Sequence, residues 1–517
     1  MLKRTISKGN LLLLTAGGMI GSGWLFSPFI SAKIAGPYAL LAWIIAFLCI
    51  VCIALPLCEL GALFPMAGGM VNYPGILYGP GMSFMFGWIL WIGYVVCSPI
   101  EVQAIIQYAS YFFPALVKTD FHLSLLGFIA AVVLLFLMFL INALGVKLLT
   151  SCNRFFSIFK FIVPLVTIFA FWVVAPSATH HVKWLIPSRV SDWQHVFMAI
   201  AYGGIAFSFV GFQSGLFMGG EVKQPHQAIP ISLLGSVGLG FALYFLLQWS
   251  FLIAVPDTAL TSGWSHLSFV GHESPMVGLA LICGLGWIAF LLMIDASISP
   301  LGTTLVYTAI NSRILYAMGL NKDLPKFLSR LNRFKVPGIA LGINFILGIL
   351  SFIPFSGWQN MVVFFSSCSI LSYMIGPVCL NAFRTHHPEV KTVFRLKYVH
   401  FWCFISFYAS MLMLLCCGFD ILNKLLIAIV LGILFYWRSK CSLKTELPWV
   451  LWILQVMMVL LTLAYLENGT LRLFPYDLIL LLPMSYGLLK QSARFANPIK
   501  TEDLPQHVRL HLKVQPL

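Results

Sequence analysis

Long apolar stretches recur along the whole 517-residue chain, and they limit what it can fold into. Fourteen of them reach about 18 residues, close to the length that a helix needs to cross a bilayer. Hydrophobic residues make up 60% of the chain and charged residues only 9%, more apolar surface than a water-soluble fold can bury. The sequence therefore predicts an all-α polytopic membrane protein. The predicted spans start near Leu11, Tyr38, Ser83, Leu123, Phe155, Phe197, Ile231, Leu285, Ile339, Met361, Val399, Ile421, Val450 and Asp477.

Two features leave the number of spans open. The stretch between Ser265 and Gly284 is apolar but weakly so, which predicts a re-entrant or surface helix rather than a further span. The last apolar stretch, after Asp477, is short. The sequence therefore predicts about 14 spans, with 12 or 13 as alternatives.

Basic residues outnumber acidic ones, and their positions indicate the orientation. The chain has 31 Lys and Arg and a formal net charge of +15. If the N-terminus is cytoplasmic, 24 of them fall in inner segments, six in outer segments and one, Lys160, within a span. This asymmetry follows the positive-inside rule and predicts that both termini are cytoplasmic. The charge is therefore a topology signal, and no nucleic-acid partner is expected.

Two of the predicted spans carry a cluster of glycines near their middle. The first cluster covers residues 17–23, and the second covers residues 203–211. Each glycine weakens a helix by roughly 1 kcal/mol relative to alanine, and unwound backbone at membrane depth must be buried in protein or line a wet cavity. Interruptions in corresponding spans of two halves indicate a transporter binding site between inverted repeats. The alternative is that the glycines only allow close helix packing.

Four short motifs resemble, in order, those of the amino acid–polyamine–organocation (APC) superfamily. They lie after the start of span one, after span two, after span six and at the end of span eight, so the resemblance covers roughly residues 10–400. The segment 21–26 together with the number of spans is most similar to bacterial permeases related to the aspartate–proton symporters. The motifs are Ile20-Gly21-Ser22-Gly23, Glu59-Leu60-Gly61 with Phe64-Pro65, Glu221-Val222-Lys223-Gln224-Pro225, and Arg313-Ile314-Leu315-Tyr316 with Leu324-Pro325.

This resemblance implies an architecture and a function. Residues 1–400 would form a LeuT-type core of five-plus-five inverted repeats, residues 401–490 about four additional helices, and residues 491–517 a polar cytoplasmic tail. The implied activity is secondary active transport of amino acids across the cytoplasmic (inner) membrane of a bacterium, as proton-coupled symport with alternating access around the broken spans one and six. An antiporter that exchanges one amino acid for another, or for an amine, is the alternative.

A broken helix exposes backbone N–H groups at the start of its second half, where the helix dipole also favours an anion. Residues Ile20, Gly21, Ser22 and Gly23 are therefore expected to bind the carboxylate of the substrate. Carbonyl groups freed around Gly203, Gly204 and Ser208 are expected to bind its amino group. The family resemblance implies the same arrangement.

Four ionisable residues lie at or near membrane depth, where such residues are expected to be functional. Lys160 matches a span-five lysine that, in proton-coupled relatives, takes the place of a sodium ion; the alternative is a lysine that snorkels to the surface. Glu101 in span three is expected to bind a proton or the substrate amine, or else to cap a helix disturbed by Pro99. Asp295 has a coupling or a structural role, and for Glu59 a structural ion pair is expected.

Two aromatic residues match gate positions of the family. Phe207 and Tyr307 are expected to close over the substrate by changes of rotamer, with packing between spans as the alternative. Gln213 stands where some relatives that carry basic substrates have a carboxylate, which disfavours arginine and lysine as substrates.

The sequence offers little support for other classes of protein. No nucleophile–base pair, phosphate loop or metal-ligand spacing stands out, so neither an enzyme nor a cofactor nor a metal site is expected. No span carries the polar ring that a channel filter needs. The expected partners are an amino acid, protons and the lipid bilayer. Neither the identity of the amino acid nor the oligomeric state follows from the sequence.

Overall fold

The computed structural model describes residues 4, 6–66, 68–118, 122–144, 146–174, 187, 189–269, 274–320, 324–355, 357–390, 392–439, 443–468 and 474–497. The side chains of 145–158, 439–446 and 468 lie outside this description, as does the predicted tail beyond residue 497. Within the described residues, helices are the regular elements and only two isolated β-bridges occur.

The helices fall into two groups, those up to the end of the second broken helix and those after it. The first group is α1 (Lys8–Met19), α2 (Gly23–Ala35), α3 (Ala39–Leu63), α4 (Tyr73–Leu77), α5 (Pro80–Ala109), α6 (Leu125–Ala143), α7 (Val146–Val174), α8 (Val190–Tyr202), α9 (Ile205–Phe209) and α10 (Ser214–Phe217). The second group is α11 (Pro225–Ala254), α12 (Pro275–Ile282), α13 (Gly286–Leu320), α14 (Gly338–Ser351), α15 (Gly357–Tyr373), α16 (Ile375–His386), α17 (Val399–Leu415), α18 (Gly418–Ser439), α19 (Leu443–Asn468) and α20 (Tyr476–Arg494).

Both glycine clusters interrupt a helix, as the sequence predicts. Ile20 is extended after α1, and α2 begins at Gly23. Gly204, with φ +76°, separates α8 from α9, and the two parts of that helix are bent by 48°. A left-handed φ is one that glycine adopts without steric cost, whereas other residues rarely do. Gly204 therefore determines where the second helix breaks, whereas the first helix ends at an extended Ile20 beside its glycines.

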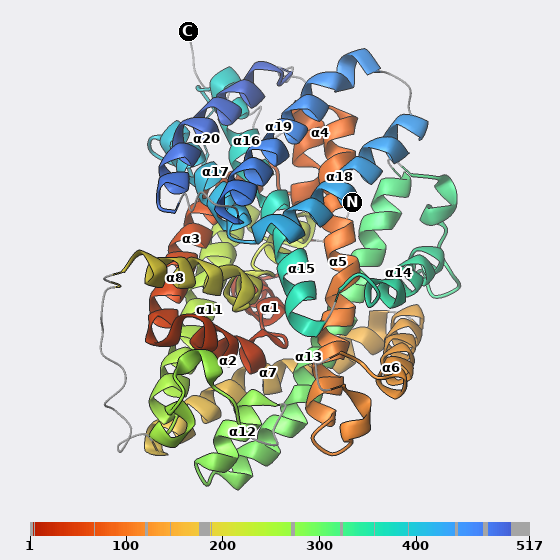
Figure 1. Ribbon diagram of the computed structural model, residues 1–517. Helices are drawn as coiled ribbons and strands as arrows, with labels where there is room; N and C mark the ends of the chain where they lie inside the picture. The colour runs from red at the N-terminus through yellow and green to blue at the C-terminus, as the bar shows by residue number, and fades with distance from the viewer. Residues whose placement is uncertain are drawn as a thin grey trace.

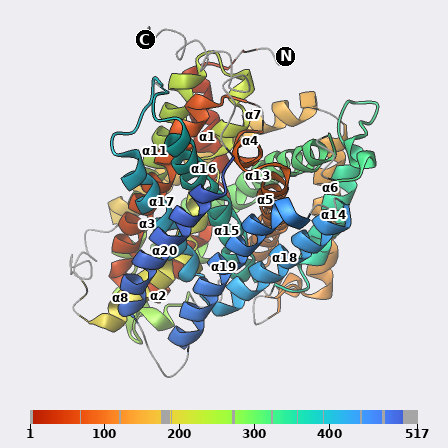
Figure 2. The same ribbon diagram turned by 90° about the horizontal axis from the view of Figure 1, so that it is seen from above.

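The helices form a layered bundle around the two broken segments (Figures 1 and 2). Helices α3 and α11 pack together, as do α5, α13 and α15. Helices α6 and α14 pack against each other at the periphery, and their exposed apolar residues are those expected of a lipid-facing surface. The C-terminal helices α17–α20 gather on one side of the bundle in both views. The broken segments consequently lie inside the protein.

Length and hydropathy confirm a membrane protein with many spans. Eight helical stretches of the described residues are long and apolar enough to cross a membrane, or nine if the bent pair of α8 with α9–α10 is one span. Three shorter apolar helices, at 159–174, 338–351 and 399–415, add to them. Every predicted start lies in a helix or within two residues of one. The count of 14 stays a prediction.

The apolar stretch between Ser265 and Gly284 contains only short helices. Its longest described helix, α12, has eight residues and packs against α2 and α13. Because a span needs about 20 residues, this segment is a surface or re-entrant piece, in agreement with the sequence.

Glu59 forms a buried ion pair, as the structural interpretation predicts. Arg384 of α16 donates through Nε (2.7 Å) to Glu59 Oε1, and its Nη2 contacts the same oxygen. The backbone N–H of Leu396 donates to Glu59 Oε2 at 2.8 Å, and Arg384 also donates to the carbonyl of Val390. One carboxylate thus connects α3, α16 and the segment that leads to α17.

The segment ahead of α1 is tied to the connection that precedes α11. Ile6 N–H donates to the Glu221 carbonyl at 3.1 Å, and Lys223 N–H donates to the Ile6 carbonyl at 3.0 Å. These two hydrogen bonds form a single parallel bridge between Ile6 and Val222. The segments that flank the two broken helices, before α1 and after α10, are therefore held together on this side of the protein.

Candidate functional site

The backbones of the two broken helices touch each other directly. A Cβ atom added to Gly211, where φ is +122°, would lie 2.6 Å from the carbonyl oxygen of Gly18. One added to Gly23 would lie 2.9 Å from Ser208 Oγ and 3.2 Å from the ring of Phe207. Only glycine fits at Gly211, where the clash is with backbone and φ is left-handed, whereas a larger residue at Gly23 would require Ser208 and Phe207 to move. The two clusters, 180 residues apart in sequence, form one site.

A carboxylate from α5 lies against the first break. The N–H of Ser22 donates to Glu101 Oε2 at 2.8 Å, and a Cβ on Gly21 would collide with Glu101 Oε1. That oxygen is buried and has no hydrogen-bond partner among the described residues. In this conformation Glu101 therefore occupies the Ser22 N–H, and the binding of a substrate carboxylate there stays a prediction.

Lys160 reaches the break from the opposite side. Its ammonium donates to Thr303 Oγ1 at 2.7 Å and to the carbonyl of Gly17 at 3.4 Å. The Thr303 hydroxyl in turn lies 3.2 Å from the carbonyl of Ile20. Only 2% of the Lys160 side chain is exposed, which contradicts the alternative of a snorkelling lysine. Lys160 therefore links α7, α13 and the unwound end of α1.

Helix α13 presents a polar stripe to this site. Asp295, Ser299, Thr303 and Tyr307 follow one another at intervals of four residues and are all buried, which places them on one helix face. The Ser299 hydroxyl lies 2.8 Å from each carboxylate oxygen of Asp295. Lys160 lies close enough to Glu101 and Asp295 for their charges to interact. The site therefore brings one cation together with two carboxyl groups.

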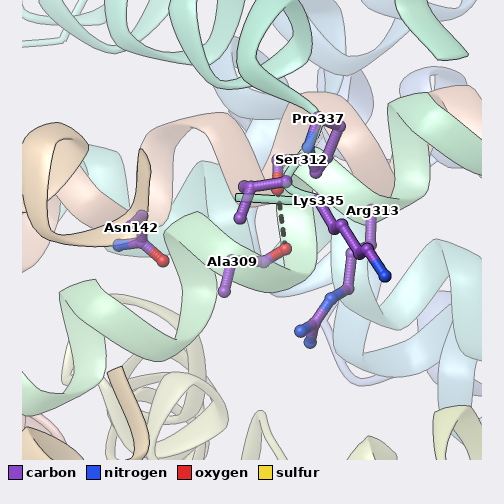
Figure 3. A pocket seen from close by; sticks show the side chains of 7 residues that line it. Asn142, Ala309, Ser312, Arg313, Lys335 and Pro337 are labelled. Carbon is purple, nitrogen blue, oxygen red and sulfur yellow. Dashed lines mark hydrogen bonds between the residues drawn. The ribbon is translucent and has the colours of Figure 1, made fainter. Parts of the chain in front are cut away.

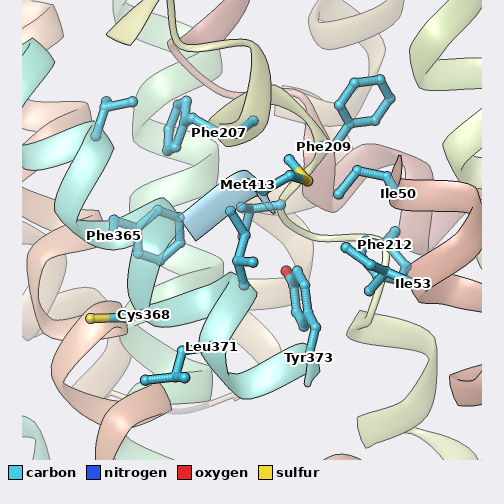
Figure 4. Close-up of a cluster of buried hydrophobic side chains, with 14 of the residues drawn as sticks. Ile50, Ile53, Phe207, Phe209, Phe212, Phe365, Cys368, Leu371, Tyr373 and Met413 are labelled. Carbon is cyan, nitrogen blue, oxygen red and sulfur yellow. The ribbon is translucent and has the colours of Figure 1, made fainter. Parts of the chain in front are cut away.

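Aromatic side chains cover the second half of the first break. The indole N–H of Trp358 donates to Ser22 Oγ at 3.0 Å, and its ring stacks on Phe26 with 4.7 Å between centroids. Phe207 makes edge contacts with Trp358 at 5.8 Å and with Phe365 at 5.7 Å. Figure 4 shows Phe207 beside Phe365, while Phe209 lies on the other side of the segment. Phe207 therefore faces the site.

Tyr307 contacts the last turn of α1, beside the first break. Its hydroxyl donates to the Gly18 carbonyl at 3.3 Å, and its ring meets that of Tyr94 at 5.2 Å. Gln213 donates through Nε2 to the Tyr94 hydroxyl at 2.6 Å. Its Oε1 accepts from Gly211 N–H and from the Tyr373 hydroxyl, both at 2.9 Å. The side-chain amide of Gln213 thus links the backbone at Gly211 to Tyr94 of α5 and Tyr373 of α15.

The carbonyl groups of the second cluster are less open than predicted. The Gly204 carbonyl accepts from both the N–H (3.1 Å) and the hydroxyl (3.0 Å) of Ser208. Gly203 packs against Ser31, to which an added Cβ would come within 3.0 Å. In this conformation α9 therefore uses the Gly204 carbonyl, and the binding of a substrate amino group there stays a prediction.

The structure gathers the predicted residues into one buried region and adds some that the sequence analysis missed. Thr303 is the central one, since it connects Lys160 to Ile20. The sequence did contain a pattern that could have identified Thr303, because polar residues recur every four positions from Asp295 to Tyr307. Trp358, Phe365 and Tyr94 were also missed, because a chain with 15 Trp, 17 Tyr and 44 Phe offers no pattern that singles them out.

Comparison with known proteins places these observations in a family. The family model for amino acid permeases matches residues 9–436. A glutamate/serine transporter of Bacillus subtilis, AimA, is 34% identical over 504 residues, which cover 94% of this chain and 92% of that protein. The aspartate–proton symporter of the same organism is 30% identical over 477 residues, covering 90% of this chain and 91% of that protein. A branched-chain amino acid permease, BcaP, is 22% identical over 464 residues.

Proposed function

Because the chain belongs to the amino acid permease family of the APC superfamily, we propose that it is a secondary active transporter of amino acids. It works by proton symport in the cytoplasmic (inner) membrane of a bacterium, with both termini in the cytoplasm. In this proposal residues 1–400 form the five-plus-five inverted-repeat core, 401–490 the accessory helices and 491–517 a polar tail, which gives 14 spans in total. The observation that carries the proposal is the direct contact of the two broken helices beside Lys160 and Glu101.

The substrate carboxylate binds at the first break in place of Glu101. The N–H of Ser22 now donates to Glu101 Oε2, which makes Glu101 an internal substitute for an incoming carboxylate. A neutral, protonated Glu101 can leave that N–H to the substrate, so one negative charge replaces another beside Lys160. Proton binding and substrate binding are then linked through a single backbone donor.

Lys160 takes the position of a bound cation. Its ammonium contacts one backbone carbonyl and one hydroxyl, at Gly17 and Thr303, and oxygen ligands of this kind also hold hard metal ions. A lysine there supplies a positive charge in the place where a sodium ion would otherwise bind, and burial allows it to cycle between its charged and neutral forms. Its charge balances the carboxylate at the break, whether that of Glu101 or that of the substrate.

The substrate amino group binds at the second break. Ser208 lies against Gly23, so an amino acid whose carboxylate is held at Gly21–Gly23 has its ammonium within reach of α9. Release of the Gly204 carbonyl from Ser208 frees an acceptor for it. Phe207 and Tyr307 enclose the ligand, and a ring face adds a cation–π contact worth about 0.5–2 kcal/mol.

The similar proteins guide the choice of substrates. Those with the higher identities are named for glutamate, serine and aspartate, and Gln213 offers no charge to a basic side chain. We propose that acidic or small neutral amino acids are carried, and that arginine and lysine are not.

Uptake into proteoliposomes with a panel of labelled amino acids tests the function. Symport predicts saturable uptake that an inside-alkaline pH gradient stimulates, in liposomes that contain no amino acid. Exchange, the alternative, predicts uptake only when substrate is present inside. Absence of uptake and of exchange for every amino acid, with protein of verified insertion, would refute the assignment.

Glu101→Gln is expected to flatten the pH dependence of uptake. Glutamine preserves size and can still accept from the Ser22 N–H, but it cannot bind a proton at this position. Wild-type uptake should rise as the outer pH falls, whereas the variant should vary less than about twofold over the same range. Initial rates across a pH series, scaled to the amount of inserted protein, provide the measurement. A pH profile identical to wild type would assign Glu101 to structure.

Phe207→Leu is expected to weaken apparent substrate affinity roughly tenfold, about 1.4 kcal/mol, because it removes the ring that faces the site. Phe207→Trp and Phe207→Tyr should be tolerated better, and Tyr307→Phe tests the hydroxyl that donates to Gly18. Phe209→Leu is the control, since Phe209 is also buried but packs on Trp43. Equal losses in Phe207→Leu and Phe209→Leu would indicate packing rather than a gate.

A further inference from the structure

The connection between α13 and α14 alternates basic and exposed apolar residues. Phe327, Leu331 and Phe334 are exposed by 46%, 49% and 41%. Interleaved with them stand four exposed basic residues, Lys326, Arg330, Arg333 and Lys335. Apolar side chains beside basic ones are typical of segments that lie in the interface of an anionic membrane. These basic and apolar residues of the connection are not among the residues of the candidate transport site described above.

A hollow lies beside this connection. It is a shallow hollow that is open to solvent, and the figure of about 310 Å³ for its empty space includes that solvent. Figure 3 shows Arg313 and Lys335 near each other at its rim, with Asn142 across from them. Neither cation has an ion-pair partner in the part of the chain that the structure describes. The lining residues are Asn142, Ala309, Ser312, Arg313, Lys335, Val336 and Pro337.

The turn that carries Lys335 is firmly held. Asn332 Oδ1 accepts from the N–H groups of Phe334 (2.9 Å) and Val336 (3.0 Å), and Asn332 Nδ2 donates to the Ala143 carbonyl at 2.9 Å. Lys335 itself has a φ of +60°, which is uncommon for a residue other than glycine. The position of its charge is therefore set by the fold, and a preorganised site spends less free energy on ordering.

Two neighbouring features favour an anion with an apolar tail. Helix α14 begins at Gly338, next to the hollow, and the first N–H groups of a helix favour negative charge. Leading away from the hollow, α6 and α14 expose Leu140, Leu144, Ile339 and Ile346. A headgroup in the hollow would thus continue into acyl chains along these two helices.

We propose that this surface binds the phosphate group of an anionic phospholipid, between Arg313 and Lys335, with Phe327, Leu331 and Phe334 inserted into the interface. The site is separate from the transport site and independent of the proposed transport activity. Its two cations favour an anion such as a phosphodiester, and the exposed apolar faces of α6 and α14 favour a lipid over free phosphate.

Binding of a fluorescent short-chain phosphatidylglycerol to purified protein in neutral detergent tests the proposal. Arg313→Gln combined with Lys335→Asn should raise the apparent Kd about tenfold or more, since two charge-assisted contacts are lost. Asparagine is chosen because it tolerates a positive φ. Lys326→Gln combined with Arg330→Gln is the control, because it removes the same charge from the same connection outside the hollow, and it should change the Kd by less than about threefold.

Four further results are needed to interpret this experiment. The lipid-free variants must elute as monodisperse protein, and phosphatidylcholine must bind about tenfold more weakly than phosphatidylglycerol. Equal losses in the two double variants would overturn the proposal in favour of diffuse surface attraction. Displacement of phosphatidylglycerol by millimolar inorganic phosphate would overturn it in favour of a free anion.

Discussion

Replacement of Gly21 or Gly23 by valine is expected to abolish amino acid uptake while the protein still inserts and stays folded. A side chain at Gly21 would collide with Glu101 and come within 3.1 Å of Thr303 Oγ1. At Gly23 it would press on Ser208 Oγ and on Phe207. In both places the added bulk fills the space where a carboxylate must approach the backbone. Uptake should fall by more than about a hundredfold, since the substrate carboxylate cannot reach the backbone N–H groups in the required geometry.

Uptake rates and size-exclusion profiles of the same preparations provide the measurement. Gly238→Val is the matched control: it adds the same side chain within a helix, at a glycine that has nothing within 4 Å of its added Cβ. It should transport within about twofold of wild type. Near-normal uptake in both Gly21→Val and Gly23→Val would refute the proposed carboxylate site.

Replacement of Lys160 by alanine is expected to abolish proton-driven accumulation. The substitution leaves the Gly17 carbonyl and the Thr303 hydroxyl without their donor, and it removes the cation that faces Glu101 and Asp295. Buried carboxyl groups without a compensating charge cannot ionise at low cost. The proton-binding equilibrium of the site should therefore be lost even where substrate still binds.

Two assays on one set of proteoliposomes separate coupling from folding. Uptake driven by a pH gradient should vanish, whereas counterflow exchange at equal pH should be retained in part. Lys33→Ala serves as the control, because this substitution removes the same charge from an exposed residue near the end of α2. Unchanged pH-driven accumulation in Lys160→Ala would remove Lys160 from the coupling mechanism.

The positions of the broken helices could be predicted from sequence because glycine leaves a local signal. A cluster such as Gly21-Ser22-Gly23 inside an apolar stretch conflicts with helix formation, whatever surrounds it. Spans could be placed for the same reason, since the length of an apolar run is also a local property. The number of spans could not be decided, because short helices such as α14 fall below any simple length criterion.

The contacts within the site could not be predicted in this way. Ser22 and Glu101 are 79 residues apart, and Lys160 and Thr303 are 143 apart. No local sequence pattern around these residues indicates which distant residue each one contacts. The sequence thus identified Glu101 as a candidate for binding a proton or the substrate amine, whereas in the structure it occupies the Ser22 N–H that was expected to bind the substrate carboxylate. Pairing across a bundle is decided by packing, which a single sequence does not contain.

The parallel bridge between Ile6 and Val222 has a practical consequence. Two backbone hydrogen bonds contribute about 1–3 kcal/mol in total, which is within the range of free energies that a single substitution changes. A shift of 1.4 kcal/mol alters a two-state ratio tenfold. An affinity tag fused directly ahead of Ile6 would change the resting conformation of the transporter, and kinetic data from N-terminally and C-terminally tagged protein should therefore not be pooled.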